Sequence, residues 1–143
     1  MSEPSTQPAA RAARIQASLI IAAIAGASAI IIGAFGAHGL QSHLPETGID
    51  AETVQRRLDQ FDTGARYHLA HAIVLVVLAV APFQRTRPIR IAFALIVAGI
   101  LFFSGSLYLL VLTNTPVLGA VTPIGGLSWI VGWALIGFGR ISR

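Results

Sequence analysis

The hydrophobic positions of this 143-residue chain are concentrated in four long runs separated by short polar segments. The runs cover about residues 15–39, 65–82, 90–112 and 122–139, and charged residues are almost absent from them. At about 1.5 Å per helical residue, runs of this length match a hydrocarbon core of about 30 Å. The pattern predicts an all-α membrane protein in which four transmembrane helices form an antiparallel bundle.

The longest polar segment, Gln41 to Thr63, separates the first two runs. Pro45 and Gly48 interrupt it early, and Asp50 is then placed to cap a short amphipathic helix in the first outer loop. The apolar face of this helix carries Val54, Leu58 and Phe61, and its polar face carries Arg56, Arg57, Asp59 and Asp62. We expect the helix to lie on the membrane surface or to lead straight into the second run, with a solvated linker as the alternative.

The start of the chain allows two interpretations. Residues 1–14 are mostly small and polar, and they predict a flexible cytoplasmic tail ahead of a membrane domain at residues 15–140. Arg11 and Arg14 precede the first run, so a cleavable signal peptide with a site near Ala25–Ala27 is an alternative to a transmembrane helix. The apolar run continues through Ile30–Ile32, beyond the core of about 7–15 residues typical of signal peptides, which favours the transmembrane helix.

Small residues recur along the first run, at Ala25, Ala29, Gly33 and Ala37. This spacing lets helix backbones approach closely in lipid. Two Thr-Pro pairs, Thr115-Pro116 and Thr122-Pro123, are candidate starts of the fourth helix, because Thr caps a helix and Pro fits its first position. We favour Thr122-Pro123, since the earlier start would leave Pro123 inside the helix, where proline kinks it.

Composition agrees with a membrane protein. Hydrophobic residues make up 55% of the chain and charged residues only 11%, and the mean hydropathy is +0.73. The chain has no cysteine, which excludes disulfides, thiolate metal sites and cysteine nucleophiles. Its net charge of +4 does not indicate a nucleic-acid partner, because the arginines lie at the ends of apolar runs, where membrane topology explains them.

The arginines also predict an orientation. If both termini are cytoplasmic, the inner side carries Arg11, Arg14, Arg85, Arg87, Arg90, Arg140 and Arg143. The outer side then carries only Arg56, Arg57 and Arg66, together with five of the six acidic residues. This asymmetry over short loops predicts a multi-pass protein of the plasma (inner) membrane with both termini in the cytoplasm.

Polar side chains within the runs gather at the predicted outer end, and we consider six of them as candidate ligand-binding residues: His38, His68, His71, Ser104, Tyr108 and Thr122. His68 and His71 share a helix face with Gly64 and Leu75, while Arg66 points the opposite way. We expect both imidazoles to face the protein interior, because facing hydrocarbon would leave their donors and acceptors unpaired.

Three roles are open for this cluster. The favoured one is structural, with the side chains hydrogen-bonding across helices. A pocket for a small ligand or a lipid headgroup is the second. The third is a metal site made by the three imidazoles, although no carboxylate lies inside the membrane to complete it, or a haem site that uses His38 with His68 or His71. We expect no cofactor. Trp129 and Trp133 are expected to pack within the protein or touch lipid.

Enzymatic and transport activities are disfavoured. No Asp or Glu is placed to orient a histidine base beside Ser104, Ser106 or Thr122, and no nucleophile elbow is present. The chain is short and has no membrane-embedded acid to couple transport to protons. We therefore expect no enzyme.

Four ordered motifs between Ile15 and Gly139 resemble one family of small bacterial membrane proteins. They are Gly33-Ala34-Phe35-Gly36-Ala37-His38-Gly39-Leu40, Arg66-Tyr67-His68 with His71-Ala72, Ser104-Gly105-Ser106-Leu107-Tyr108, and Thr122-Pro123-Ile124-Gly125-Gly126 followed by Gly132-Trp133. The family is domain of unknown function 423, also called uncharacterised protein family 0382, and is related to transmembrane protein 256. The resemblance implies a four-span membrane protein without established activity or catalytic residues. We expect a scaffold, an assembly partner or a lipid-interacting subunit, in a homo-oligomer or a larger membrane complex.

Overall fold

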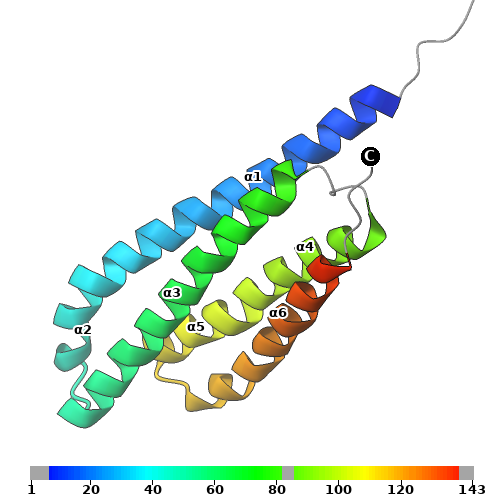
Figure 1. The fold of residues 1–143 in the computed structure, drawn as a ribbon. Coiled ribbons are helices and arrows are strands. Elements are labelled where there is room, and N and C mark those ends of the chain that lie inside the picture. Colours follow the sequence, from blue (N-terminus) through cyan, green and yellow to red (C-terminus); the bar gives the residue numbers. More distant parts are fainter. Residues whose placement is uncertain (1–6, 82–85, 139–143) are drawn as a thin grey trace, which may run out of the picture.

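The computed structural model describes residues 7–81 and 86–138, and all regular secondary structure in these residues is helical (Figure 1). Four helical segments are long and apolar enough to cross a membrane: Gln7–Glu46, Ala51–Val80, Arg87–Thr113 and Pro116–Gly137. The prediction of an all-α protein with four transmembrane helices is confirmed. Two predictions fall outside the described residues. They are the placement of Arg85, Arg140 and Arg143 on the inner side and the end of the second run at Pro82.

The first segment consists of α1 (Gln7–Phe35), a π-helical turn η1 (Gly36–Leu40) and the short helix α2 (Gln41–Glu46). Helix α1 begins inside the stretch that was predicted to be a flexible tail, since its alanine-rich first turns favour helix. The sequence did not predict α2 either. Pro45 lies in its last turn, and Gly48, at φ +77°, turns the chain toward the next helix.

The second segment is a single unbroken helix, α3 (Ala51–Val80). As predicted, Asp50 caps it, and its carboxylate accepts a hydrogen bond of 2.8 Å from the Thr53 backbone N–H, which lowers the pKa of Asp50. The predicted amphipathic helix is therefore not a separate element of the loop but the first part of α3, leading straight into the second span. Gly64 lies inside this helix, where an added Cβ would come within 3.0 Å of the Tyr108 ring and 3.4 Å of Leu107.

The third segment comprises α4 (Arg87–Gly99), a π-helical turn η3 (Ile100–Ser104) and α5 (Gly105–Thr113). It ends at Asn114, whose left-handed φ of 49° reverses the chain. A 3-10 turn η4 (Pro116–Ala120) precedes α6 (Thr122–Gly137), so the α-helix begins at the later Thr-Pro pair, whereas the apolar segment as a whole begins at Pro116. The expected cap is wrong: Val121 is the N-cap, and the Thr122 hydroxyl instead contacts Ser106.

The helices pack in a row more than in a closed bundle. Helix α1 lies along α3, α3 lies along the third segment, and the third segment lies along α6 (Figure 1). Within the described residues, α1 has no comparable packing with α4, α5 or α6. Consequently only Ala22 and Ala29 of α1 are buried, whereas nine residues of α3 are. One apolar core cluster is centred on Leu75, Ile96 and Trp129, and a second lies around Leu40, Phe61 and Tyr108.

Candidate functional site

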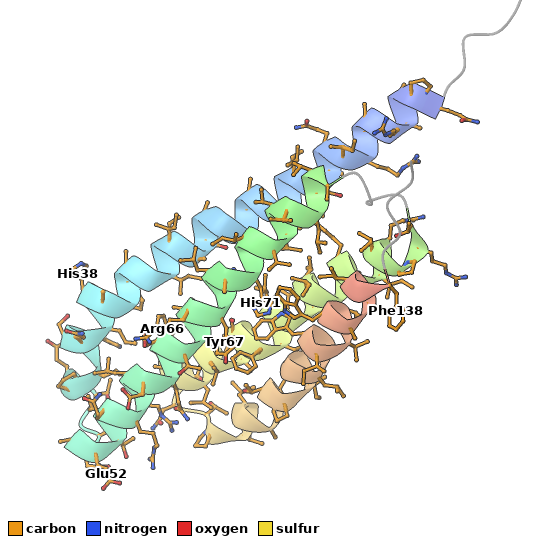
Figure 2. All side chains as sticks on the ribbon, in the orientation of Figure 1. His38, Glu52, Arg66, Tyr67, His71 and Phe138 are labelled. Carbon is orange, nitrogen blue, oxygen red and sulfur yellow. The ribbon has the colours of Figure 1, made fainter. Side chains whose placement is uncertain are left out.

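His71 lies between α3 and α6 and is 6% exposed (Figure 2). Its Nδ1 donates to the Tyr67 carbonyl oxygen at 2.8 Å, and its Nε2 accepts from the Trp133 indole N–H at 3.4 Å. The imidazole also stacks on Trp129. Both ring nitrogens are therefore used within the protein, as expected of a neutral imidazole that joins two helices.

His68, one turn earlier on the same face, is buried as predicted. Its Nδ1 lies 3.3 Å from the hydroxyl oxygen of Tyr108 on α5, and the Tyr108 ring packs on Phe61 with centroids 4.9 Å apart. Ser104 is completely buried beside this pair, and its hydroxyl lies close enough to that of Tyr108 to interact, although the two do not form a hydrogen bond of standard geometry. The predicted shared face of Ser104 and Tyr108 is thus directed at α3.

A third polar contact joins the start of α6 to the third segment. The hydroxyls of Ser106 and Thr122 lie 2.9 Å apart, and the Trp129 indole N–H donates to the Ile96 carbonyl oxygen at 3.1 Å. Trp129 is buried, whereas Trp133 is half exposed. Trp129 therefore packs inside the protein, and Trp133 reaches its surface.

His38 does not join these residues. It is exposed on η1, and Figure 2 shows it on the outer side of that turn, away from His71. No group of three or more His, Asp or Glu side chains in the part of the chain that the structure describes is arranged to hold a metal ion. The sequence-predicted set thus separates into a His68–Tyr108–Ser104 group, a Ser106–Thr122 pair and His71 with its indoles.

Close backbone approaches hold the helices that carry these groups. A Cβ on Gly99 would collide with the Trp129 ring, and one on Gly125 would collide with the backbone of Phe103. Small residues at helix crossings allow this proximity. By contrast, a Cβ on Gly26 or Gly33 of α1 would meet nothing within 4 Å. The tightest packing thus lies between the third segment and α6.

One polar contact was not predicted. Arg57, which the periodicity placed on a solvated face, is only 5% exposed. Its guanidinium donates to the side-chain oxygens of Asn114 and Gln60, each at 2.9 Å. This interaction anchors the start of α3 to the turn after α5. The only signal in the sequence was Asn114 itself, whose side chain favours a left-handed turn.

These contacts are typical of helix packing and not of a catalytic site. In the described residues no carboxylate contacts His68 or His71, and the recorded ion pair, Arg66 with Asp62, is on the exposed side of α3. Neither histidine makes a hydrogen bond to a serine or threonine hydroxyl there. The nucleophile–base–acid relay that acyl transfer needs is therefore not assembled by these residues.

Comparison with known proteins gives one consistent family. A family model described as protein of unknown function (DUF423) matches residues 32–126. The UPF0382 membrane protein of a bovine Staphylococcus aureus strain is 38% identical over 118 residues, which are 82% of this chain and 89% of that protein. YwdK, a UPF0382 membrane protein of Bacillus subtilis, is 38% identical over 120 residues, with 82% and 90% covered. The Haemophilus influenzae UPF0382 membrane protein is 34% identical over 121 residues, with 85% and 90% covered. No solved structure matches the chain.

Proposed function

We propose a non-enzymatic role for this chain, which belongs to the family described as protein of unknown function DUF423. The family resemblance expected from the four motifs is thereby confirmed. The role we infer is that of a small membrane scaffold or assembly subunit, which acts through the surfaces it presents to lipid and to other membrane proteins. Polar contacts join α3, the third segment and α6. The outward helix α1 makes the contact with a partner protein.

The observation that carries this proposal is the isolation of α1. Ile20, Ile24, Ala27 and Ile31 recur at i, i+4, i+7 and i+11 on its exposed side. The side chains of Ile24 and Ile31 are 64% and 69% exposed. Ala27 between them is small enough to let a second helix approach closely. Among the described residues α1 packs along one long helix, α3, and it is therefore suited to a second neighbour from another chain.

The polar contacts support a structural role for the interior. Hydrogen bonds to one another or to the backbone satisfy the polar groups of four side chains: His71, Trp133, Ser106 and Thr122. Interhelical hydrogen bonds of this kind stabilise membrane helices by about 0.6–2 kcal/mol each. These contacts hold α3, the third segment and α6 together, and α1 packs along α3.

We further propose that the protein lies in the plasma (inner) membrane with both termini in the cytoplasm. Arg11, Arg14 and Arg90 lie together at one end of the helices, as the positive-inside rule requires of the cytoplasmic side. The acidic residues Asp50 and Glu52 lie at the start of α3, at the other end. The first segment then acts as a transmembrane helix and not as a cleaved signal.

The assembly proposal is tested by enlarging Ala27. The chain is solubilised from its native membrane in a mild detergent, and the size of the complex it forms is compared for the wild type, Ala27→Phe and Ala134→Phe. Ala134 is exposed on α6 and provides the matched control. We expect only Ala27→Phe to reduce the size of the complex. Equal complex sizes for all three chains would reject α1 as the assembly surface.

A second candidate function, binding of a small ligand within the polar cluster, has one observation in its favour. The Ser104 hydroxyl is buried and, apart from its approach to the Tyr108 hydroxyl, makes no hydrogen bond among the described residues, whereas buried hydroxyls are usually hydrogen-bonded with good geometry. Native mass spectrometry and an optical spectrum of gently purified protein test this function. A bound species that disappears in Ser104→Ala would support it, and a wild-type protein of unmodified mass and featureless spectrum would reject it.

A further inference from the structure

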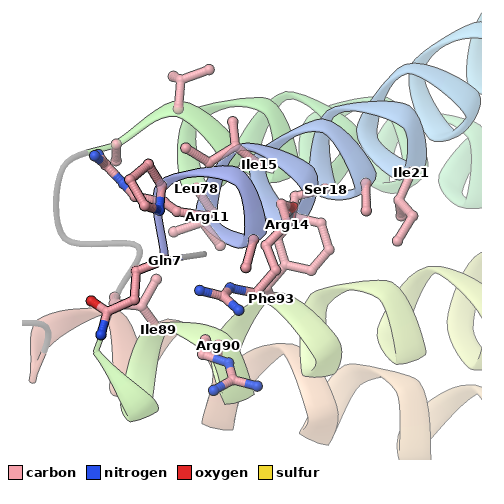
Figure 3. A pocket seen from close by; sticks show the side chains of 15 residues that line it. Gln7, Arg11, Arg14, Ile15, Ser18, Ile21, Leu78, Ile89, Arg90 and Phe93 are labelled. Carbon is pink, nitrogen blue, oxygen red and sulfur yellow. Dashed lines mark hydrogen bonds between the residues drawn. The ribbon is translucent and has the colours of Figure 1, made fainter. Parts of the chain in front are cut away.

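A groove runs between α1 and α4 at the end of the molecule that carries Arg11, Arg14 and Arg90, which we call the basic groove (Figure 3). Its volume is about 1060 Å³. It exists because α1 packs along α3 but not along α4 in the described residues, so α1 and α4 remain apart there. The end of α3 forms its floor through Leu78, Val80 and Ala81.

The walls of the basic groove are apolar away from its basic end. Ile15 and Ile21 come from α1, Leu78 from α3, and Ile89 and Phe93 from α4. These side chains lie along the spans, so the apolar wall continues from the end of the helices into the depth of the membrane. A wall of this kind suits an acyl chain and would offer nothing to a small soluble anion.

The basic end of the groove carries three guanidinium groups without acidic partners. Arg11, Arg14 and Arg90 are exposed, and none of their guanidinium groups makes a hydrogen bond or ion pair with another residue in 7–81 or 86–138. In Figure 3, Arg14 extends from α1 toward the side of the groove that carries Arg90. The described acidic residues all fall between positions 46 and 62, on α2, at the N-cap of α3 and in its first half. No acidic side chain of residues 7–81 or 86–138 therefore compensates the charge at the groove.

We propose that the basic groove binds one anionic phospholipid, whose headgroup phosphate lies between Arg14 and Arg90 with Arg11 beside it, and whose acyl chain lies on Ile21, Leu78 and Phe93. Guanidinium groups recognise phosphate through paired N–H donors, and basic pockets between transmembrane helices recognise anionic headgroups in this way. The lipid fills the space that the separation of α1 from α4 leaves open. The groove lies on a different side of α1 from Ile24 and Ile31, so it rests on the membrane-embedded role proposed above but not on assembly with a partner.

Native mass spectrometry of the purified full-length chain tests the lipid site. The delipidated protein in mild detergent is mixed with phosphatidylglycerol or with phosphatidylcholine of the same acyl chains. We expect one phosphatidylglycerol to bind, more tightly than phosphatidylcholine. The double variant Arg14→Gln with Arg90→Gln should weaken phosphatidylglycerol binding about 30-fold, equivalent to about 1 kcal/mol per arginine. Arg14→Lys with Arg90→Lys should retain most of it, because the charge remains.

The control is the pair Arg56→Gln with Arg66→Gln, which removes the same charge from exposed arginines of α3 that do not line the groove. This control should bind phosphatidylglycerol like the wild type. Equal binding of the two lipids by the wild type would overturn the proposal even if the arginine variants failed to fold. Equal losses in both double variants would also overturn it, as would displacement of the lipid by millimolar inorganic phosphate, which would identify a free-anion site. The assay uses the isolated chain, so its failure leaves the assembly proposal untouched.

Discussion

The imidazole of His71 lies flat on the indole of Trp129, with ring centroids 3.8 Å apart and ring planes 5° apart. This contact joins the second and fourth transmembrane segments, which are otherwise separated by the third. Tyr67 lies beside this pair, with its ring centroid 5.6 Å from that of Trp129 and 6.1 Å from that of His71. The stack and the hydrogen bond from Trp133 make His71 the polar link between α3 and α6.

Replacement of His71 tests this structural role. His71→Ala removes the stack and leaves the Trp133 N–H without its partner, so we expect the free energy of unfolding in detergent to fall by about 1–3 kcal/mol. His71→Gln keeps a donor and an acceptor and should recover part of the loss. Melting temperatures of the purified variants measure both effects.

His38→Ala is the matched control, because His38 is exposed and should change stability by less than about 0.5 kcal/mol. A His71→Ala variant as stable as the wild type would show that the imidazole does not hold the helices together. If that stable variant also lost a bound species, the cluster would be a ligand site.

The close approach of two helices at Gly125 provides a second test of the packing. Gly125→Ala would place a Cβ against the Phe103 backbone, which cannot move aside like a flexible side chain, so we expect a loss of about 1–3 kcal/mol. Gly26→Ala adds the same methyl group where nothing lies within 4 Å, and it should be neutral or slightly stabilising. Thermal unfolding of the two variants measures the difference. Similar stabilities would contradict the close approach of α6 to the third segment.

Arg57 and Asn114 form a third test. Arg57→Ala removes two hydrogen bonds from a charged donor, and we expect a loss of about 1.5–3 kcal/mol. Arg56→Ala, at an exposed neighbour, should cost less than about 0.5 kcal/mol. Asn114→Gly removes the amide but keeps a residue that tolerates a positive φ. In a double-mutant cycle, Arg57→Ala and Asn114→Gly should be coupled, and additive effects would show that the pair does not interact.

The sequence predicted which faces of the helices are buried better than which residues meet. The hydrophobic period and the distribution of charge were enough to predict the four spans, the Asp50 cap and the inward face shared by Gly64, His68 and Leu75. They did not predict that His71 would stack on Trp129. Such a contact depends on the rotation and relative depth of two helices far apart in the chain, and neither is encoded in the local pattern.

The same limit explains the two largest differences at the site. Six candidate residues were grouped by depth alone, and His38 has the right depth but faces away from the protein interior. The sequence analysis placed Arg57 on the polar face of its helix because the side chain is charged. A long side chain can bury its stem and direct its guanidinium at a polar turn, as it does at Asn114. Helix α2 was missed because a proline close to a glycine usually indicates a loop.

Membrane orientation is tested with single cysteines, which the natural chain lacks. A cysteine at Gln55 should react with an impermeant thiol reagent in intact cells, because we propose that the start of α3 is outside. A cysteine at Thr86 should react only after the membrane is opened. The reverse labelling would overturn the proposed orientation. A mature protein that starts near Ser28 would show that the first segment is a cleaved signal.

Photo-cross-linking from α1 in native membranes tests the central claim of assembly most directly. A photoreactive residue is placed at Ile24 of α1 or at Leu101 of the third segment, two sites that are each 64% exposed. After irradiation, we expect Ile24 to give a discrete protein adduct, whose mass distinguishes a second copy of this chain from another membrane protein. Leu101 should yield lipid adducts only. Lipid adducts alone from both positions, in membranes where the chain is at its natural level, would contradict the proposal that α1 is an assembly surface.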